Sequence, residues 1–147
     1  MTTTWLLRAD LFCIALILMY ISWGDILIRT ISHKCLIILM VLILVRLFLQ
    51  ERYPNIIAAG MVLFFGFILF SAGIVGGGDV KLISILSLVM EQPVLVSFFV
   101  VMTVLGAMVA LTGFCFFRKS FREYGVPYAV PISMAFLFTD PVFPLFY

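Results

Sequence analysis

Residues 92–117 read QPVLVSFFVVMTVLGAMVALTGFCFF, and none of these side chains is charged. A helix needs about 20 apolar residues to cross the hydrocarbon core of a bilayer, so this stretch is long enough to span a membrane unaided. The uncharged run 53–78 qualifies in the same way. The other uncharged runs are shorter, and they span only if charged residues at their ends reach the interface.

The composition of the whole chain also favours a membrane environment. Hydrophobic residues make up 65% of the 147 residues and charged residues only 11%, which excludes a soluble monomer. The net charge of +2 is small and dispersed, so we expect no nucleic-acid partner. The three cysteines lie far apart in apolar runs and are expected to be buried, with no metal-binding or disulfide pattern. The length predicts a single domain over residues 1–147.

We predict an all-α polytopic membrane protein, a bundle of about six transmembrane helices. The spans are expected at about 5–24, 35–49, 56–75, 79–92, 94–117 and 126–145. The fourth has the shortest uncharged run, and it crosses only if the glycine loop before it enters at membrane depth, surrounded by protein or a wet cavity. Prolines and Asp140 interrupt the sixth, which leaves its end undefined.

Lysines and arginines in the short connections predict the orientation. Six of them lie in the connections 25–34, 76–81 and 118–125, and the remaining three lie on the other side. We therefore expect these three connections to face the cytoplasm and both termini to face outward.

Two aspartates are the candidate catalytic residues. Three glycines precede Asp79 at the start of a short apolar segment, and glycine permits positive φ and close backbone approach. By itself, Asp79 could be a helix cap, and Asp25 could pair with Arg29 one helical turn on. The predicted topology, however, places both acids on one side. Neighbouring carboxylates share a proton, and such a pair can activate water and protonate a leaving amine.

Other nucleophilic or metal-dependent arrangements find little support in the sequence. The one histidine, His33, is expected to be an exposed loop residue beside Lys34. There is no G-x-S-x-G element and no H-E-x-x-H element. An aspartyl mechanism is the arrangement that remains.

Three segments resemble those of the prepilin peptidases, aspartyl proteases of the GxGD type in bacterial inner membranes. Residues 76–82, GGGDVKL, are similar to the G-x-G-D-x-K-L segment that carries one catalytic aspartate. Residues 25–33, DILIRTISH, resemble the segment of the other aspartate, with Ser32 and His33 replacing Pro-Asn. Residues 125–131, GVPYAVP, resemble the Pro-[Phe/Tyr]-Gly element before the last span, with alanine in place of its glycine.

The resemblance implies an endopeptidase that removes the leader peptide of type IV prepilins at the cytoplasmic face of the inner membrane. Asp25 and Asp79 would be catalytic, without metal or cofactor. The implied partners are membrane lipid and a prepilin, whose apolar helix lies in the bilayer beside the bundle and whose leader is cut after a glycine. Gly76, Gly77 and Gly78 would shape the substrate site. Arg29 and Lys81 are further candidates, and Lys81 either stabilises an ionised acid or snorkels to water.

The chain lacks the paired CxxC motifs of the larger prepilin peptidases, so we expect no methyltransferase activity. It looks most like the small peptidases of tight-adherence (Flp) and related type IVb pilus systems. Two alternatives stay open. In a non-catalytic assembly subunit of a pilus or secretion system, the glycines would pack helices and Asp79 would be a cap. In an ion or proton carrier, the buried acids would act as relay groups.

Overall fold

The computed structural model describes residues 2–28, 30–116 and 126–140. Within these ranges all regular structure is α-helical, with no strand, as the sequence predicts. The helices are α1 (Thr2–Ile28), α2 (His33–Leu49), α3 (Ile56–Ser71), α4 (Gly77–Ser87), α5 (Gln92–Phe116) and α7 (Ala129–Thr139).

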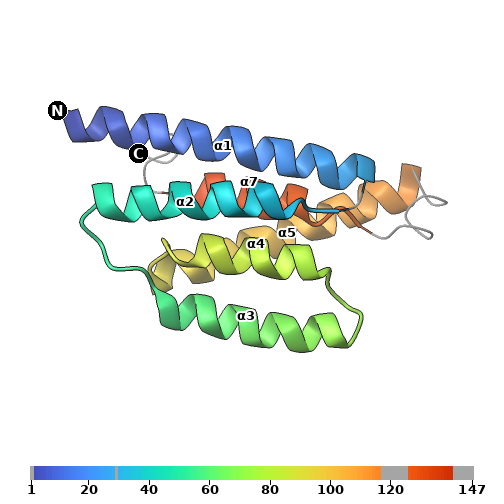
Figure 1. The fold of residues 1–147 in the computed structure, drawn as a ribbon. Helices are drawn as coiled ribbons and strands as arrows, with labels where there is room; N and C mark the ends of the chain where they lie inside the picture. The colour runs from blue at the N-terminus through green and yellow to red at the C-terminus, as the bar shows by residue number, and fades with distance from the viewer. Residues whose placement is uncertain (1, 29, 117–125, 141–147) are drawn as a thin grey trace.

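The helices lie side by side in one bundle (Figure 1). The main helix pairs are α1 with α2 and α7, α5 with α7, and α3 with α4, so α3 occupies one edge. The α1–α2 and α3–α4 connections meet at one end of the bundle, which we call the Asp79 end. The α2–α3 and α4–α5 connections meet at the other end, which we call the Arg46 end.

Two helices are long and apolar enough to cross a membrane, over Thr4–Ile28 and Gln92–Cys115. Large apolar side chains also cover much of the outer surface, among them Phe48, which is 84% exposed, and Ile57, which is 79% exposed. An extensive exposed apolar surface indicates contact with lipid or protein rather than water. The helices and this surface are consistent with a membrane protein.

Several helix ends differ from the sequence prediction. The first helix continues past Gly24 through Asp25 to Ile28. The third ends at Ser71 rather than at residue 75, because Gly73 adopts a φ of 72°. The Gly73 N–H then bonds the Phe70 carbonyl and the next N–H bonds the Leu69 carbonyl, which together form a Schellman motif.

The fourth helix begins at Gly77 and ends at Ser87, whereas a span over 79–92 was expected. Its 11 residues rise about 16 Å, roughly half the thickness of the hydrocarbon core. α7 begins at Ala129, after Pro127, and Pro131 lies in its first turn, where a proline removes no intrahelical bond. The predicted end of the last span falls on residues 141–145, outside the described residues.

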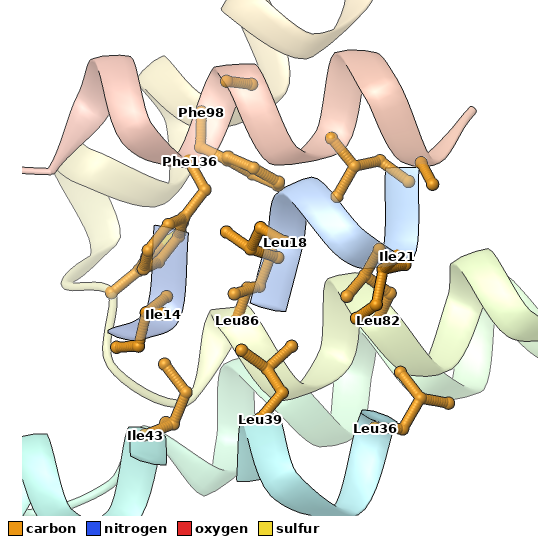
Figure 2. Packing of buried hydrophobic residues seen from close by; sticks show 14 of the residues in the cluster. Ile14, Leu18, Ile21, Leu36, Leu39, Ile43, Leu82, Leu86, Phe98 and Phe136 are labelled. Carbon is orange, nitrogen blue, oxygen red and sulfur yellow. The ribbon is translucent and has the colours of Figure 1, made fainter. Parts of the chain in front are cut away.

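The core contains one apolar stripe from each of several helices (Figure 2). The spacing of three and four residues places each stripe on one helix face. Its central members are Ile14, Leu18 and Ile21 of α1, Leu36, Leu39 and Ile43 of α2, Leu82 and Leu86 of α4, Phe98 of α5 and Phe136 of α7.

The expectation that all cysteines are buried is wrong. Cys13 and Cys115 are exposed on the outer face of the bundle, where apolar side chains are frequent, as they are in the core.

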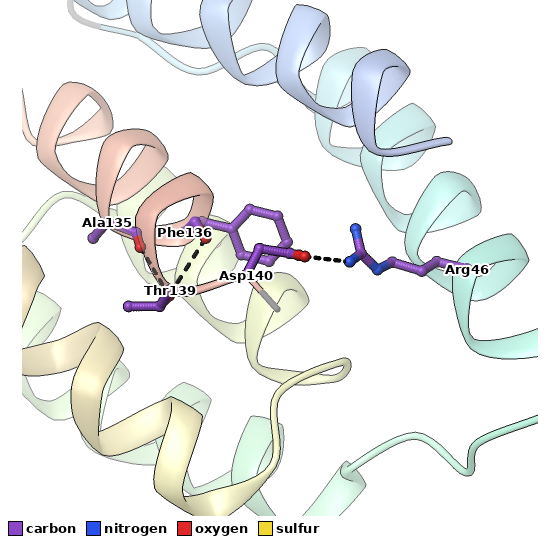
Figure 3. A network of polar contacts seen from close by, with 5 residues as sticks. All are labelled: Arg46, Ala135, Phe136, Thr139 and Asp140. Atoms are coloured by element: carbon purple, nitrogen blue, oxygen red, sulfur yellow. Dashed lines mark hydrogen bonds and ion pairs between the residues drawn. The ribbon is translucent and has the colours of Figure 1, made fainter. Parts of the chain in front are cut away.

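At the Arg46 end, a buried ion pair joins α2 to the end of α7 (Figure 3). Arg46 Nη2 lies 2.6 Å from Asp140 Oδ1, and the two side chains are 1% and 3% exposed. Asp10 of α1 interacts electrostatically with both groups. A basic residue near the end of an apolar run is expected to reach the interface, but Arg46 is 1% exposed and its guanidinium pairs with Asp140 inside the bundle.

Removing one member of this pair should destabilise the protein strongly. Arg46→Leu leaves Asp140 buried without its cation, and breaking a buried pair costs about 3–5 kcal/mol. The Arg46→Leu/Asp140→Leu double variant should recover part of that loss. Unfolding in detergent measures the change.

The exposed pair Arg52–Glu91 provides the control, because its side chains are 51% and 59% exposed at an N–O distance of 2.7 Å. Arg52→Leu should cost less than about 1 kcal/mol. Equal losses for Arg46→Leu and Arg52→Leu would contradict the burial argument.

Candidate active site

Asp25 lies near the end of α1 and is only 7% exposed. Its Oδ2 accepts a hydrogen bond of 3.1 Å from the backbone N–H of Ala129. This N–H belongs to the first residue of α7, where no intrahelical acceptor exists. The contact therefore satisfies the helix start and places a negative group where the helix dipole favours one.

Two serines support this contact. The Ser22 hydroxyl lies 3.0 Å from Ser133 Oγ and 3.3 Å from the Ala129 carbonyl oxygen. Ser133 Oγ in turn lies 3.4 Å from the Leu18 carbonyl oxygen. These bonds hold the first turns of α7 against α1. The contact on α1 lies one helical turn before Asp25. The sequence analysis missed Ala129 and both serines as parts of the site, although residues 127–129 belong to one of the segments that it singled out.

Asp79 lies in the first turn of α4, but it does not cap that helix. The N-cap is Gly76, and no side chain makes a cap hydrogen bond there. Asp79 Oδ1 is buried and has no hydrogen-bond partner among the residues that the structure describes. An unpartnered polar atom in a buried place is costly and calls for a functional explanation. The alternative in which Asp79 caps this helix is therefore wrong.

The two acids lie at the same end of the bundle, Asp25 near the end of α1 and Asp79 in the first turn of α4. The α1–α2 connection also packs on the start of α4, since Ile31 is the neighbour of Gly78. Two carboxylates that come close in a buried site cannot both ionise cheaply, and such a pair favours a shared proton. The fold thus brings together two carboxylates that are 54 positions apart in the sequence.

The three glycines before Asp79 provide space rather than unusual backbone angles. Gly76 is extended at φ −69°, and Gly73 is the one glycine of the described residues with positive φ. A Cβ at Gly76 would lie 2.9 Å from Asp79 Oδ2. At Gly77 and Gly78 it would lie 3.2 Å from the Phe70 ring and 3.1 Å from Ile31. Glycine permits both positive φ and close backbone approach, and here the close approach is what the fold uses, because Gly77 and Gly78 already belong to the helix.

The basic candidates do not join the acids in the part of the chain that the structure describes. Lys81 is exposed between the buried residues Val80 and Leu82, and no ion pair involves it there. Arg29 lies outside the described residues. His33 is the exposed first residue of α2. Over the described ranges, no three His, Cys, Asp or Glu side chains gather as metal ligands.

Asp79 also lines one end of a large apolar groove of about 610 Å³ between α3 and α5. The groove gives this acid access from the side of the bundle. Asp25, by contrast, approaches from α1 and is held by α7.

A comparison with protein-family models matches residues 12–111 to the type IV leader peptidase family. The matched range contains both aspartates and the three glycines. No curated protein and no solved structure matches the chain. The family match covers more than half of the chain, and the protein belongs to the type IV leader peptidase family.

Proposed function

We propose that this protein is an intramembrane aspartyl endopeptidase that removes the leader peptide of type IV prepilins, with Asp25 and Asp79 as its catalytic pair. The family match supports a leader peptidase and a prepilin substrate. The observation that carries the catalytic assignment is that both acids lie at one end of the bundle, where Asp25 is buried and Asp79 has a buried carboxyl oxygen. A non-catalytic assembly subunit or an ion carrier has no observation of its own in its favour.

The two acids sit in different surroundings, which suggests different roles. The Ala129 N–H donates to Asp25 and stabilises its carboxylate form. Asp79 has a buried oxygen without a partner, a setting that suits a protonated acid. We therefore assign Asp25 as the first base and Asp79 as the first acid.

In this mechanism, the Asp25 carboxylate takes a proton from water while the water oxygen attacks the scissile carbonyl carbon. Asp79 gives its proton to the carbonyl oxygen, which yields a neutral tetrahedral intermediate. The intermediate then collapses: its C–N bond breaks, the nitrogen takes the proton from Asp25, and a hydroxyl proton returns to Asp79. Both acids regain their starting states, and the products are a carboxyl group and an amine.

The membrane setting remains part of the proposal. The basic connections favour the cytoplasmic face of the bacterial inner membrane for the Asp79 end. The exposure of Lys81 supports snorkelling rather than a contact with the acids. Arg29 stays a candidate contact for the leader. The absence of CxxC pairs from this sequence favours a prepilin of the Flp type.

Asp25→Asn and Asp79→Asn should each abolish leader removal, by at least a hundredfold, while the protein still accumulates. Asparagine keeps size and polarity but cannot take or give the proton. Co-expression with a candidate prepilin measures this as the loss of its size shift on a gel.

Asp10→Asn is the matched control, because Asp10 is also a buried acid of α1 but lies at the Arg46 end. This variant should still process the prepilin. Normal processing by either Asp25→Asn or Asp79→Asn would refute the assigned pair.

Gly76→Ala should slow cleavage at least tenfold without loss of folded protein, because the new methyl group would lie 2.9 Å from Asp79 Oδ2 and must displace this carboxyl group. Gly60→Ala is the control, since a Cβ there meets no atom within 4 Å. Initial cleavage rates in detergent compare the two. Equal rates for both variants would mean that the position of the Asp79 carboxyl group does not limit catalysis.

A further inference from the structure

The groove beside Asp79 is bounded by four helices. Its floor is α4, its walls are α3 and α5, and Tyr128 and Ile132 of the α7 region close it at the Asp79 end. We call it the α3–α5 groove. Asp79 is the one charged residue that lines it, so the groove is an apolar channel that leads to a candidate catalytic acid.

The walls have the spacing of helix faces. On α3 the groove is lined by Ile57, Ala58, Met61, Val62, Phe65 and Leu69, and on α5 by Leu95, Val96, Phe99 and Met102. Steps of three and four residues place each set on one face of its helix. Several of these side chains are exposed in the isolated chain, including Met61 at 55% and Phe65 at 56%. The α3 face therefore lacks a packing partner over much of its length, whereas Leu95, Phe99 and Met102 of α5 also pack partly against the core.

The polar groups of the groove lie at its ends. Asn55 lies at the Arg46 end, and its side chain is already bonded to the Ala58 N–H and the Met90 carbonyl. Between Asn55 and Asp79 the lining on α3 is apolar. An extended peptide would find no partners here for its backbone N–H and C=O groups, whereas a helix satisfies them internally. The interior of the groove thus favours a helical occupant.

We propose that the α3–α5 groove binds the apolar helix of the prepilin, with the start of that helix at Asp79. This proposal rests on the proposed function and deepens it, because it names the surface that receives the substrate. The groove is continuous with the candidate catalytic acid, which distinguishes it from the other apolar faces of the bundle. From Ile57 to Leu69 the α3 wall rises about 18 Å, enough for about three turns of the substrate helix.

This docking accounts for the position of the scissile bond. The substrate helix fills the groove with side chains at helical spacing, a familiar helix-in-groove mode of recognition. Its N-terminal end reaches the Asp79 end of the bundle, where the chain can become extended and enter between the two acids. The apolar contact, although remote from the reaction, positions the scissile bond. It therefore lowers the entropic part of the activation barrier for cleavage.

Disulfide cross-linking tests the docking directly. The enzyme carries Cys13→Ala, Cys35→Ala and Cys115→Ala, together with Asp79→Asn so that the substrate stays intact. Met61→Cys is then added in the groove wall. Its prepilin partner has a single cysteine in the first three turns of the apolar helix. Oxidation in membranes should give an enzyme–prepilin adduct.

Leu63→Cys is the matched control, on the same helix, 46% exposed but outside the groove. The adduct should be at least fivefold more abundant for Met61→Cys than for Leu63→Cys. Equal yields, no adduct at Met61→Cys, or an enzyme–enzyme adduct in its place would each overturn the docking. The last two outcomes would point to lipid or to a second copy as the occupant.

A groove-filling variant gives a second readout. Ala58→Phe places a ring in the groove, whereas Gly60→Phe places it on the open side of the same helix, where a Cβ meets no atom. We expect Ala58→Phe to raise KM for the prepilin at least tenfold with little change in kcat, and Gly60→Phe to leave both near the wild-type values. Equal effects of the two variants would contradict the proposal.

The design separates the two claims. Cross-linking uses an inactive enzyme and does not depend on cleavage. If the wild-type enzyme and its cysteine-free form fail to process the prepilin, the proposed function fails. If they process it and the adduct is absent or unselective, only the docking site fails.

Discussion

The position of α7 depends on two polar contacts, one at each end of the helix. At its start the Ala129 N–H donates to Asp25 of α1, and just beyond its end Asp140 pairs with Arg46 of α2. Asp25, Arg46 and Asp140 are buried, so each of these polar groups must be satisfied inside the bundle. Together they set the register of α7 against α1 and α2. The carboxyl group of Asp25 is thereby held in a defined place.

The other acid, Asp79, lies in the first turn of the short helix α4. α4 has only 11 residues, so its start lies within the bundle rather than beyond it. Gly76, Gly77 and Gly78 let this start approach Phe70 and Ile31 closely and leave room for the Asp79 carboxyl group. A short helix also leaves α3 with contacts mainly to α4, and the groove opens between α3 and α5.

The helical pattern of the fold could be predicted from the sequence because uncharged runs and their flanking charges are local signals. The placement of both acids at one end followed from counting the predicted spans. The helix ends were less accurate: Gly73, rather than the glycine run at 76–78, ends α3, and which glycine adopts positive φ depends on tertiary packing.

The remaining parts of the site depend on contacts between distant residues, which a single sequence does not encode in any local pattern. Ala129 meets Asp25 from 104 positions away, and Asp140 meets Arg46 from 94 positions away. From the sequence alone, a basic residue near the end of an apolar run is expected to lie at the interface. Its buried partner, here Asp140, becomes visible only in the folded chain. For the same reason, the role of Gly76 as space for the Asp79 carboxyl group appears only in the folded chain.

The central claim is that Asp25 and Asp79 share one site, and a distance constraint tests it most directly. In the cysteine-free background, Asp25→Cys/Asp79→Cys is treated with a short bifunctional thiol reagent and digested for mass spectrometry. Ser22→Cys/Ser133→Cys is the positive control, because these hydroxyl oxygens are 3.0 Å apart. Our account predicts bridged peptides within one chain for both pairs. Bridging of the serine positions without any bridging of positions 25 and 79 would contradict it.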